Sequence, residues 1–454
     1  MTGGIVTVTG AAQHIVSVTV NGSQAFSLAQ SYADAVNSAA SGSTLYAVAG
    51  SGVPTPTASS LPVNEYVANA GGFYTYPSGF NYFTTDTTSQ VFVDATAATA
   101  GTTLNTLVGT GGAIYLAGSE SGTFIAGGGN NLFINNGAGA YTVATSDGND
   151  SIFAGSGATY VAAGTGDNLI RLGAGADTVQ SDGTDRIFAG TGPDTVVLTG
   201  TNSTIYGGSG SMVVDDTNAT GTSISGGSGA ASIFGGTSGF YNLSGASTIF
   251  SGASDTIAAS GNSTVYGAAG TSFTETGSAA LLFIGSTGSS TVNSGSGAAT
   301  VFGSNGSDIT YSGHGTLVAG SGNETLDGSG STQGFAGFIS NQVAAGNNSI
   351  AGGTGTDTLV AGLGSQTLSG GSGAGNLFVI AANGTMSSAN ITISDFGSAT
   401  GNLVALYGYG ANEVQNSLAT AVTSGSNTTI TLADSSKVTF LNVTTLDPSK
   451  FVGG

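Results

Sequence analysis

Acidic and amide side chains recur at a regular spacing in the middle of the chain. Five of them lie between residues 146 and 196, separated by one or two steps of eight or nine residues: Asp150, Asn168, Asp177, Asp185 and Asp194. Carboxylates and turn carbonyls are the hard oxygen ligands that Ca²⁺ prefers. Carboxylates brought close together repel each other unless a cation lies between them. The spacing therefore indicates cation binding, provided that the fold brings successive repeats side by side.

Apolar residues follow the same period and define the elements that must position these side chains. They recur at steps of eight or nine residues: Ile152, Val161, Ile170, Val179, Ile187, Val196 and Ile205. This period fits a solenoid half-turn, in which a Gly-rich turn precedes a short strand with one inward side chain. Two half-turns make a coil of about 18 residues, and coils stack about 4.8 Å apart. We expect the interruptions of the period near 205–224, 273–292 and 326–350 to be loops or bulged turns.

This phrase resembles the Gly-rich nonapeptide of RTX proteins, which form a calcium-binding parallel β-roll and leave the cell by type I secretion. The phrases NLFVI and ITISDFGS, after residue 374, resemble the C-terminal module of RTX exoproteins. The resemblance implies an all-β fold, a right-handed parallel β-roll or β-solenoid. We expect a small α+β or β cap over 1–110 and a degenerate solenoid over 111–374. A β module with an uncleaved secretion signal should follow over 375–454.

The resemblance implies that the acidic position of each repeat, with turn carbonyls, holds calcium. Alternate half-turns lie on opposite edges of a solenoid. One edge should therefore stack Asp150, Asn168 and Asp185, and the other Asp177 and Asp194. Weaker candidates are Asp255 and Asp357. The alternative is that these side chains only cap turns by hydrogen bonding to the main chain.

Aromatic residues follow the inward anchor in seven half-turns and should point outward, because side chains alternate along a strand. They are Phe153, Phe188, Tyr206, Phe234, Phe250, Tyr266 and Phe302. One register slip between 206 and 233 would place them all on one face. An exposed apolar stripe usually marks a contact surface, so we expect either self-assembly or coverage by a terminal domain, unless the phase is inverted and the rings form the core.

The N-terminal region is predicted to contain an amphipathic helix over 23–40 and, over 66–92, a concentration of aromatic residues. Tyr74, Tyr76 and Tyr82 belong to that concentration. They could cap the open end of the solenoid, or they could dock onto another molecule or a cell-surface polysaccharide.

Composition excludes several classes of function. The chain has 454 residues, 80 of them Gly, with four Lys and Arg against 24 Asp and Glu. Four basic residues cannot follow a phosphate backbone, which argues against nucleic-acid binding. Cys is absent. The sequence has no run of about 18 apolar residues, and because MTGGIVTVTG lacks a basic and an apolar segment, we expect no cleavable signal peptide. No H-E-x-x-H or usable nucleophile elbow occurs, so we expect no enzyme.

These observations predict a secreted, calcium-binding structural protein at the surface of a Gram-negative bacterium. It would leave by a type I secretion apparatus and self-assemble as a surface-layer, filament or biofilm-matrix subunit. An adhesin that binds glycan or ice is the alternative, because Thr residues also recur before the anchors, as at Thr178 and Thr195. A polysaccharide-modifying enzyme is more remote, because it would need basic groups in its cleft.

Overall fold

The computed structural model describes residues 4–9, 15–20, 22–51, 56–304, 306–320, 322–339, 346–382 and 388–453. The chain divides into two compact units, Met1–Thr237 and Ser238–Gly454. Both are built almost entirely of short parallel strands, and the described residues include two α-helices. The predicted all-β parallel solenoid is confirmed.

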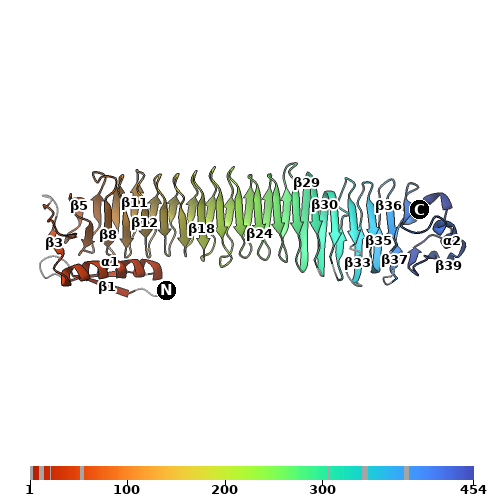
Figure 1. Ribbon diagram of the computed structural model, residues 1–454, viewed down its shortest axis with the longest axis horizontal. Helices are drawn as coiled ribbons and strands as arrows, with labels where there is room; N and C mark the ends of the chain where they lie inside the picture. The colour runs from red at the N-terminus through yellow and green to blue at the C-terminus, as the bar shows by residue number, and fades with distance from the viewer. Residues whose placement is uncertain are drawn as a thin grey trace. The chain divides into compact units, whose positions relative to one another are not determined.

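Through most of the chain, parallel pairing joins a strand to the strand two places further along, so every coil contributes to two stacks (Figure 1). In the first unit, one stack, here called the odd stack, consists of β5 (Gly72–Thr75), β7 (Val91–Asp94), β9 (Ala113–Ala117), β11 (Leu132–Asn135), β13 (Ser151–Phe153), β15 (Leu169–Arg171), β17 (Arg186–Phe188), β19 (Thr204–Tyr206) and β21 (Ser223–Ser225). The even stack consists of β3 (Leu45–Gly50), β4 (Val63–Ala68), β6 (Tyr82–Thr85), β8 (Thr103–Val108), β10 (Ser121–Ala126), β12 (Tyr141–Ala144), β14 (Thr159–Ala162), β16 (Thr178–Ser181), β18 (Asp194–Leu198), β20 (Met212–Asp215) and β22 (Ala231–Phe234).

The inward anchors form the core, and each pairs with the anchor one coil later. Ile152 pairs with Ile170, and Ile170 with Ile187, all fully buried. Burying an aliphatic side chain of this size stabilises a protein by about 1.5–3 kcal/mol. Glycine is required where coils approach closely. A Cβ added at Gly173 would lie 1.6 Å from the Gly155 carbonyl oxygen. Gly164 has a φ of +68°, which side chains rarely adopt.

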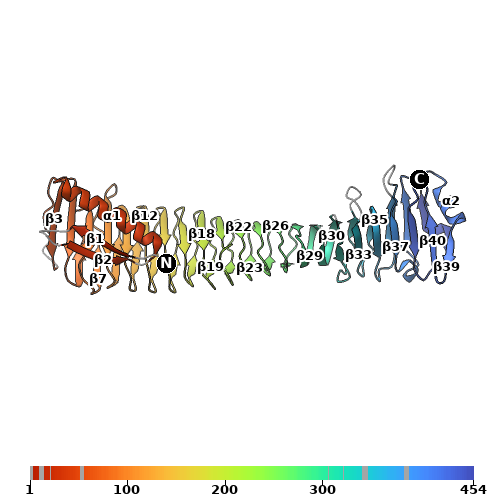
Figure 2. The same ribbon diagram turned by 90° about the horizontal axis from the view of Figure 1, so that it is seen from below.

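An antiparallel hairpin and one helix cover the even stack of the first unit. The hairpin is β1 (Gly4–Thr9) and β2 (Ile15–Val20), and the helix α1 (Ser23–Ser41) agrees with the predicted helix. Small and apolar residues on one side of α1, including Ala29 and Ala33, join Val67, Leu107 and Ile125 in one buried cluster. Figure 2 shows the helix and hairpin lying across these early coils.

The predicted boundary at residue 110 is not an end of the coils. β3 and β4 already pair in parallel, with Leu45 opposite Val63, and the pairing continues without interruption through β6 and β8. The prediction missed these coils because Tyr, Thr and Asn replace the Gly-rich phrase. The N-terminal cap is therefore the hairpin and α1, and much of the 1–110 segment is solenoid.

The second unit also has two stacks. One contains β23 (Phe240–Leu243), β25 (Thr256–Ala259), β27 (Ser272–Glu275), β31 (Thr325–Asp327), β33 (Gly346–Ala351), β35 (Gly364–Ser369), β37 (Asn390–Ile393) and β41 (Lys437–Phe440). The other contains β24 (Ser247–Phe250), β26 (Ser263–Tyr266), β28 (Leu281–Ile284), β32 (Ala336–Ile339), β34 (Thr358–Ala361), β36 (Leu377–Ala381), β38 (Leu403–Tyr407) and β42 (Phe451–Gly453). Two long strands, β29 (Gly288–Phe302) and β30 (Ser307–Ala319), contribute to both stacks.

Most strands of the predicted β module over 375–454 continue the parallel stacks. β36 pairs in parallel with β38, and β38 with β42. Antiparallel pairing is confined to β39 (Val422–Ser424), β40 (Asn427–Thr431) and β41. A short helix, α2 (Glu413–Ala419), and two 3₁₀ turns, Phe396–Ser398 and Pro448–Lys450, complete this end of the unit.

Two of the three expected loops contain regular half-turns. The predicted break at 205–224 holds β20, whose anchor Val214 is fully buried. The break at 273–292 holds β28, with Phe283 as its anchor. In the third break, β32 places Gly337 opposite Leu317 and Leu359, where an apolar anchor would stand.

Candidate functional site

The first candidate site is the edge of the first unit that carries Asp150, Asn168 and Asp185. Each side chain accepts a hydrogen bond from the main-chain N–H one coil earlier. The Asn131 N–H donates to Asp150 Oδ1 (2.7 Å), the Asp150 N–H to Asn168 Oδ1 (2.8 Å), and the Asn168 N–H to Asp185 Oδ1 (2.9 Å). Ser203 continues the series by accepting from the Asp185 N–H (3.1 Å). These side chains therefore cap successive turns and tie the coils together.

The opposite edge carries Asp177 and Asp194. Asp177 Oδ1 accepts from the Thr159 N–H (2.7 Å), and Asp194 Oδ2 accepts from the Gly190 N–H (2.8 Å). Both side chains are buried. Capping is therefore present on both edges, as the non-metal alternative predicted.

One oxygen of several carboxylates is buried and has no hydrogen-bond partner. These atoms are Asp150 Oδ2, Asp185 Oδ2 and Asp194 Oδ1. Burial raises the pKa of all three carboxyl groups. For Asp194 the pKa rises to about 6, chiefly through burial and to a lesser extent through the negative charge of Asp177. Buried polar atoms are rarely left unpaired in proteins, so each of these oxygens is suited to accept from a further hydrogen-bond donor, to take a proton or to bind a cation.

The ligand atoms are oxygens, which is the type that Ca²⁺ prefers, but few carboxylates come together at any one place. The free carboxylate oxygens lie at turns that also present main-chain carbonyls, and these are hard ligands. Within the described residues, however, no group of three or more His, Asp or Glu side chains could hold a metal ion. Asn168 separates the carboxylates of Asp150 and Asp185 by two coils. The Asp177 and Asp194 edge brings two carboxylates into adjacent coils. Both oxygens of Asp177 accept main-chain hydrogen bonds there, from Thr159 and Gly173, so Asp194 Oδ1 is the free carboxylate oxygen of this edge.

Asp255 and Asp357 are fully used as turn caps. Asp255 accepts from the Gly239 N–H (2.7 Å) through Oδ1 and from the Gly252 N–H (2.6 Å) through Oδ2. Asp357 accepts from Phe335 and Gly353 in the same way. Because both oxygens of each residue are engaged, these positions offer less to a cation than Asp194 does.

The predicted outward aromatic residues do point outward, but they do not form one stripe. In the first unit Phe153, Phe188 and Tyr206 lie on the odd stack, and the Phe188 and Tyr206 rings stack with centroids 4.8 Å apart. Arg171 occupies the intervening rung, with its guanidinium 5.3 Å from the Phe188 ring centroid. Phe234 belongs to the even stack, where it pairs with Asp215.

The second unit has its own aromatic stripe. Phe250 and Tyr266 pair on β24 and β26, with ring centroids 4.6 Å apart. Ile284 follows on β28 and Phe302 on β29. The expectation of a single face was wrong because β20 is a full half-turn, so Phe234 falls on the other stack from Tyr206.

The tyrosines proposed for docking are mostly core residues. Tyr74 and Tyr76 are only 3% and 7% exposed. Tyr74 packs against Phe83, and its hydroxyl donates to the Ala70 carbonyl (2.7 Å). Tyr82 is half-buried against Tyr32 of α1, with ring centroids 5.1 Å apart. This group caps and fills the first coils, and Tyr74 and Tyr76 cannot form a docking surface.

The sequence analysis missed most of the apolar surface that the odd stack presents. Two rows of outward side chains, one on each side of the anchors, run along this stack. The row before the anchors is Phe73, Phe92, Ile114, Leu132, Ser151, Leu169, Arg186 and Thr204. The row after them is Thr75, Asp94, Leu116, Ile134, Phe153, Arg171, Phe188 and Tyr206. We call the two rows together the odd face. Their signal in the sequence was an apolar or aromatic residue on at least one side of each anchor, and on both sides at Tyr115 and Phe133.

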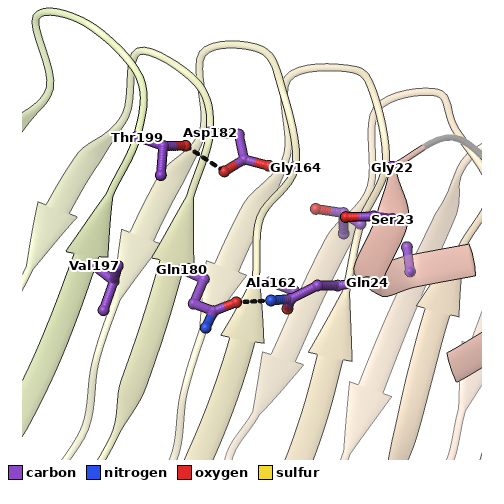
Figure 3. Close-up of a pocket in the computed structure, with 11 residues that line it drawn as sticks. Gly22, Ser23, Gln24, Ala162, Gly164, Gln180, Asp182, Val197 and Thr199 are labelled. Atoms are coloured by element: carbon purple, nitrogen blue, oxygen red, sulfur yellow. Dashed lines mark hydrogen bonds between the residues drawn. The ribbon is translucent and has the colours of Figure 1, made fainter. Parts of the chain in front are cut away.

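The pocket in Figure 3 lies where α1 begins against the even stack. Gln24 and Gln180 hydrogen-bond across it, and Thr199 donates to Asp182 Oδ1 (2.6 Å). Its volume is about 220 Å³. The pocket follows the seam between the start of the helix and the sheet.

The His314 side chain contacts the main chain: its Nδ1 lies 3.2 Å from the Gly297 carbonyl oxygen. The other histidine, His14, lies outside the described residues. The contact of His314 with a main-chain carbonyl does not pair it with a nucleophile.

Comparison with known proteins gave no relative. No family model matches the chain, and no curated protein or solved structure matches it either. Among the described residues, no helix is both long enough and apolar enough to cross a membrane.

Proposed function

We propose that this protein is a structural subunit that self-assembles outside the cell. The observation that carries the proposal is the odd face, an outward apolar surface on a regular parallel stack. α1 and the hairpin pack on the even stack and leave the odd face open. Phe73 at one end is 51% exposed and Tyr206 at the other is 39% exposed. Large exposed apolar patches rimmed by polar residues mark interaction sites.

Calcium is part of the proposal as a stabiliser of the acidic edges. A cation held by Asp177, Asp194 and turn carbonyls would satisfy the free Asp194 oxygen and offset the repulsion between the two carboxylates. It would also reduce the formal net charge of −20, which opposes close packing of copies. The resemblance to RTX exoproteins supports type I secretion and a location at the surface of a Gram-negative bacterium, as a surface-layer, filament or biofilm-matrix subunit.

Sedimentation velocity over a range of concentrations tests the assembly proposal. Wild-type protein should form larger species as its concentration rises, and the double variant Phe153→Asp, Phe188→Asp should remain monomeric. Val213→Asp is the matched control, because Val213 is an exposed outward residue of the even stack. Assembly that is unchanged in the double variant, or wild-type protein that is monomeric throughout, would reject the proposal.

A second function, glycan binding, is favoured by a polar trough in the second unit. The trough has a volume of about 540 Å³, and all its lining side chains are polar, including Asp308, Asn323, Asn347, Ser365 and Asn390. Hydroxyl and amide groups that repeat at strand spacing could hydrogen-bond to a neutral polysaccharide.

A glycan array separates the two functions. Binding that is lost in Asn347→Ala, Asn390→Ala and kept in Phe153→Asp, Phe188→Asp would assign a glycan site to the trough. An array on which wild-type protein binds nothing would exclude this second function.

A further inference from the structure

The odd face carries an ordered arrangement of charge. Among the described outward residues of its two rows, the charged ones are Asp94 near the N-terminal end, and Arg171 and Arg186 toward the other end. Apolar rungs separate them, and those of the row after the anchors are Leu116, Ile134 and Phe153. The two arginines are half of the four basic residues in the chain. The acidic residue lies near one end and the basic residues toward the other. A second copy of this face, turned end for end, would therefore place opposite charges against each other.

We infer that the occupant of the odd face is the odd face of a second copy, turned end for end. This inference rests on the proposed self-assembly and specifies its partner and geometry. The odd stacks of the two copies face each other, and their strands run in the same direction while their coils follow one another in opposite directions. A two-fold axis parallel to the strands relates the two copies. Such an interface is isologous, so a contact from residue i to j is matched by one from j to i.

The charges fix the register of the two copies. In the row Asp94, Leu116, Ile134, Phe153, Arg171 the middle member is Ile134. An axis through the Ile134 rung sets Asp94 of each copy opposite Arg171 of the other and sets Leu116 opposite Phe153. Ile134 then faces itself. Opposite charges that meet in this way favour one orientation over others.

The second row agrees with the same register. Its middle member is Leu132, so Phe92 lies opposite Leu169. Phe73 lies opposite Arg186, and an arginine over an exposed phenylalanine ring gives a cation–π contact. This contact gives a role to the exposed Phe73 ring.

The other two-fold arrangement is disfavoured. An axis along the stacking direction keeps each rung opposite itself. Arg171 and Arg186 of both copies would then gather at one end, and Asp94 would face Phe92. Like charges brought together at an interface oppose association, so the charge pattern selects the reversed arrangement.

The size of the contact predicts reversible association. The register overlaps seven rungs, from β5 to β17, which span roughly 29 Å, and the two rows with their margins are about 13 Å wide. The footprint is therefore roughly 400 Å² per copy, below the roughly 800 Å² per partner of a stable specific interface. We expect a dimer whose population depends on concentration and which is reinforced by further contacts in an assembly.

Single-cysteine cross-linking tests the register, since the chain contains no Cys. Facing sheets stand about 10 Å apart, so Ile134→Cys should be joined to itself by a short bismaleimide. Val213→Cys on the even stack is the control and should not react in this way. In the Ile134→Cys background, Asp94→Arg should raise the dimer dissociation constant about tenfold. Each dimer would lose its two attractive Asp94–Arg171 pairs and would have two pairs of like charge in their place. Adding Arg171→Asp should restore the dissociation constant, which also excludes misfolding.

The outcomes separate this inference from the proposed function. Cross-linking at Ile134 that Asp94→Arg weakens and the double reversal restores supports the inference. Larger assemblies in which Ile134→Cys is unlinked, or in which the charge reversals have no effect, overturn the register and leave the proposed self-assembly intact. Protein that is monomeric throughout overturns both.

Discussion

Replacing Glu65 by Gln should strengthen the docking of α1 at neutral and alkaline pH. Glu65 lies on β4, fully buried in the even stack that α1 covers. Its Oε1 accepts a hydrogen bond from Thr84 (2.5 Å), and the Thr84 hydroxyl lies 2.8 Å from the Tyr32 hydroxyl of α1. Its Oε2 has no partner. Glu65 interacts electrostatically with Tyr32 and Tyr82, and neither tyrosine offers a positive charge.

The magnitude follows from the pKa of Glu65, which burial raises from 4.5 to about 7. The folded protein therefore keeps this proton to a higher pH than the unfolded chain does. The resulting loss of stability is absent below about pH 4.5, grows as the pH rises, and is complete above about pH 7. Each pH unit of difference corresponds to about 1.4 kcal/mol, so the full loss is about 3 kcal/mol.

Hydrogen–deuterium exchange of peptides from α1 and β4 measures this effect locally. After correction for the intrinsic exchange rate, protection in the wild type should fall by about two orders of magnitude between about pH 5 and about pH 8. Glu65→Gln keeps an oxygen for Thr84 and cannot ionise, so its protection should stay nearly constant. Equal pH dependence in the wild type and the variant would refute the reasoning.

Three further predictions concern the coils. Gly173→Ala should lower the free energy of unfolding by more than about 1 kcal/mol, because its Cβ would overlap the Gly155 carbonyl oxygen. The control Ala174→Gly should lower it by less, and equal denaturation curves for the two variants would contradict this. Asp255→Asn should destabilise by about 1–3 kcal/mol, because the new amide group cannot accept from the Gly252 N–H, and unchanged stability would show that this cap is dispensable. Tyr74→Ala should cost about 3–5 kcal/mol by opening a cavity against Phe83, and a variant of native stability by thermal unfolding would restore Tyr74 as a surface candidate.

The sequence predicted the repeating unit well because one physical requirement sets it. Every coil needs an apolar anchor, so Ile152, Ile170 and Ile187 fall 17 or 18 residues apart and pair in the structure. The helix was predictable for a similar reason, since Ala29, Ala33 and Val36 share its buried side.

The errors arose where the anchor or the turn changed its residue type. Val214 was not counted as an anchor because DDTNATGT, in place of a Gly-rich phrase, follows it before the next anchor, Ile224. The missed half-turn exchanged the two faces for every residue after it. Tyr74 was placed outside because a cluster of aromatic residues does not by itself reveal which of them is inward. The hydrogen bonds that use one oxygen of Asp194 and leave the other free depend on the path of the neighbouring turn, which no residue pattern specifies.

Negative-stain electron microscopy of the full-length protein, with calcium and then with a chelator, tests whether the solenoid assembles. The account predicts ordered sheets or filaments in calcium, with wild-type protein and Val213→Asp behaving alike and Phe153→Asp, Phe188→Asp remaining dispersed. Loss of order in the chelator would further support a cation at the Asp177 and Asp194 edge. Separate single molecules in both conditions, at every concentration, would contradict the claim that this solenoid is an assembling structural subunit.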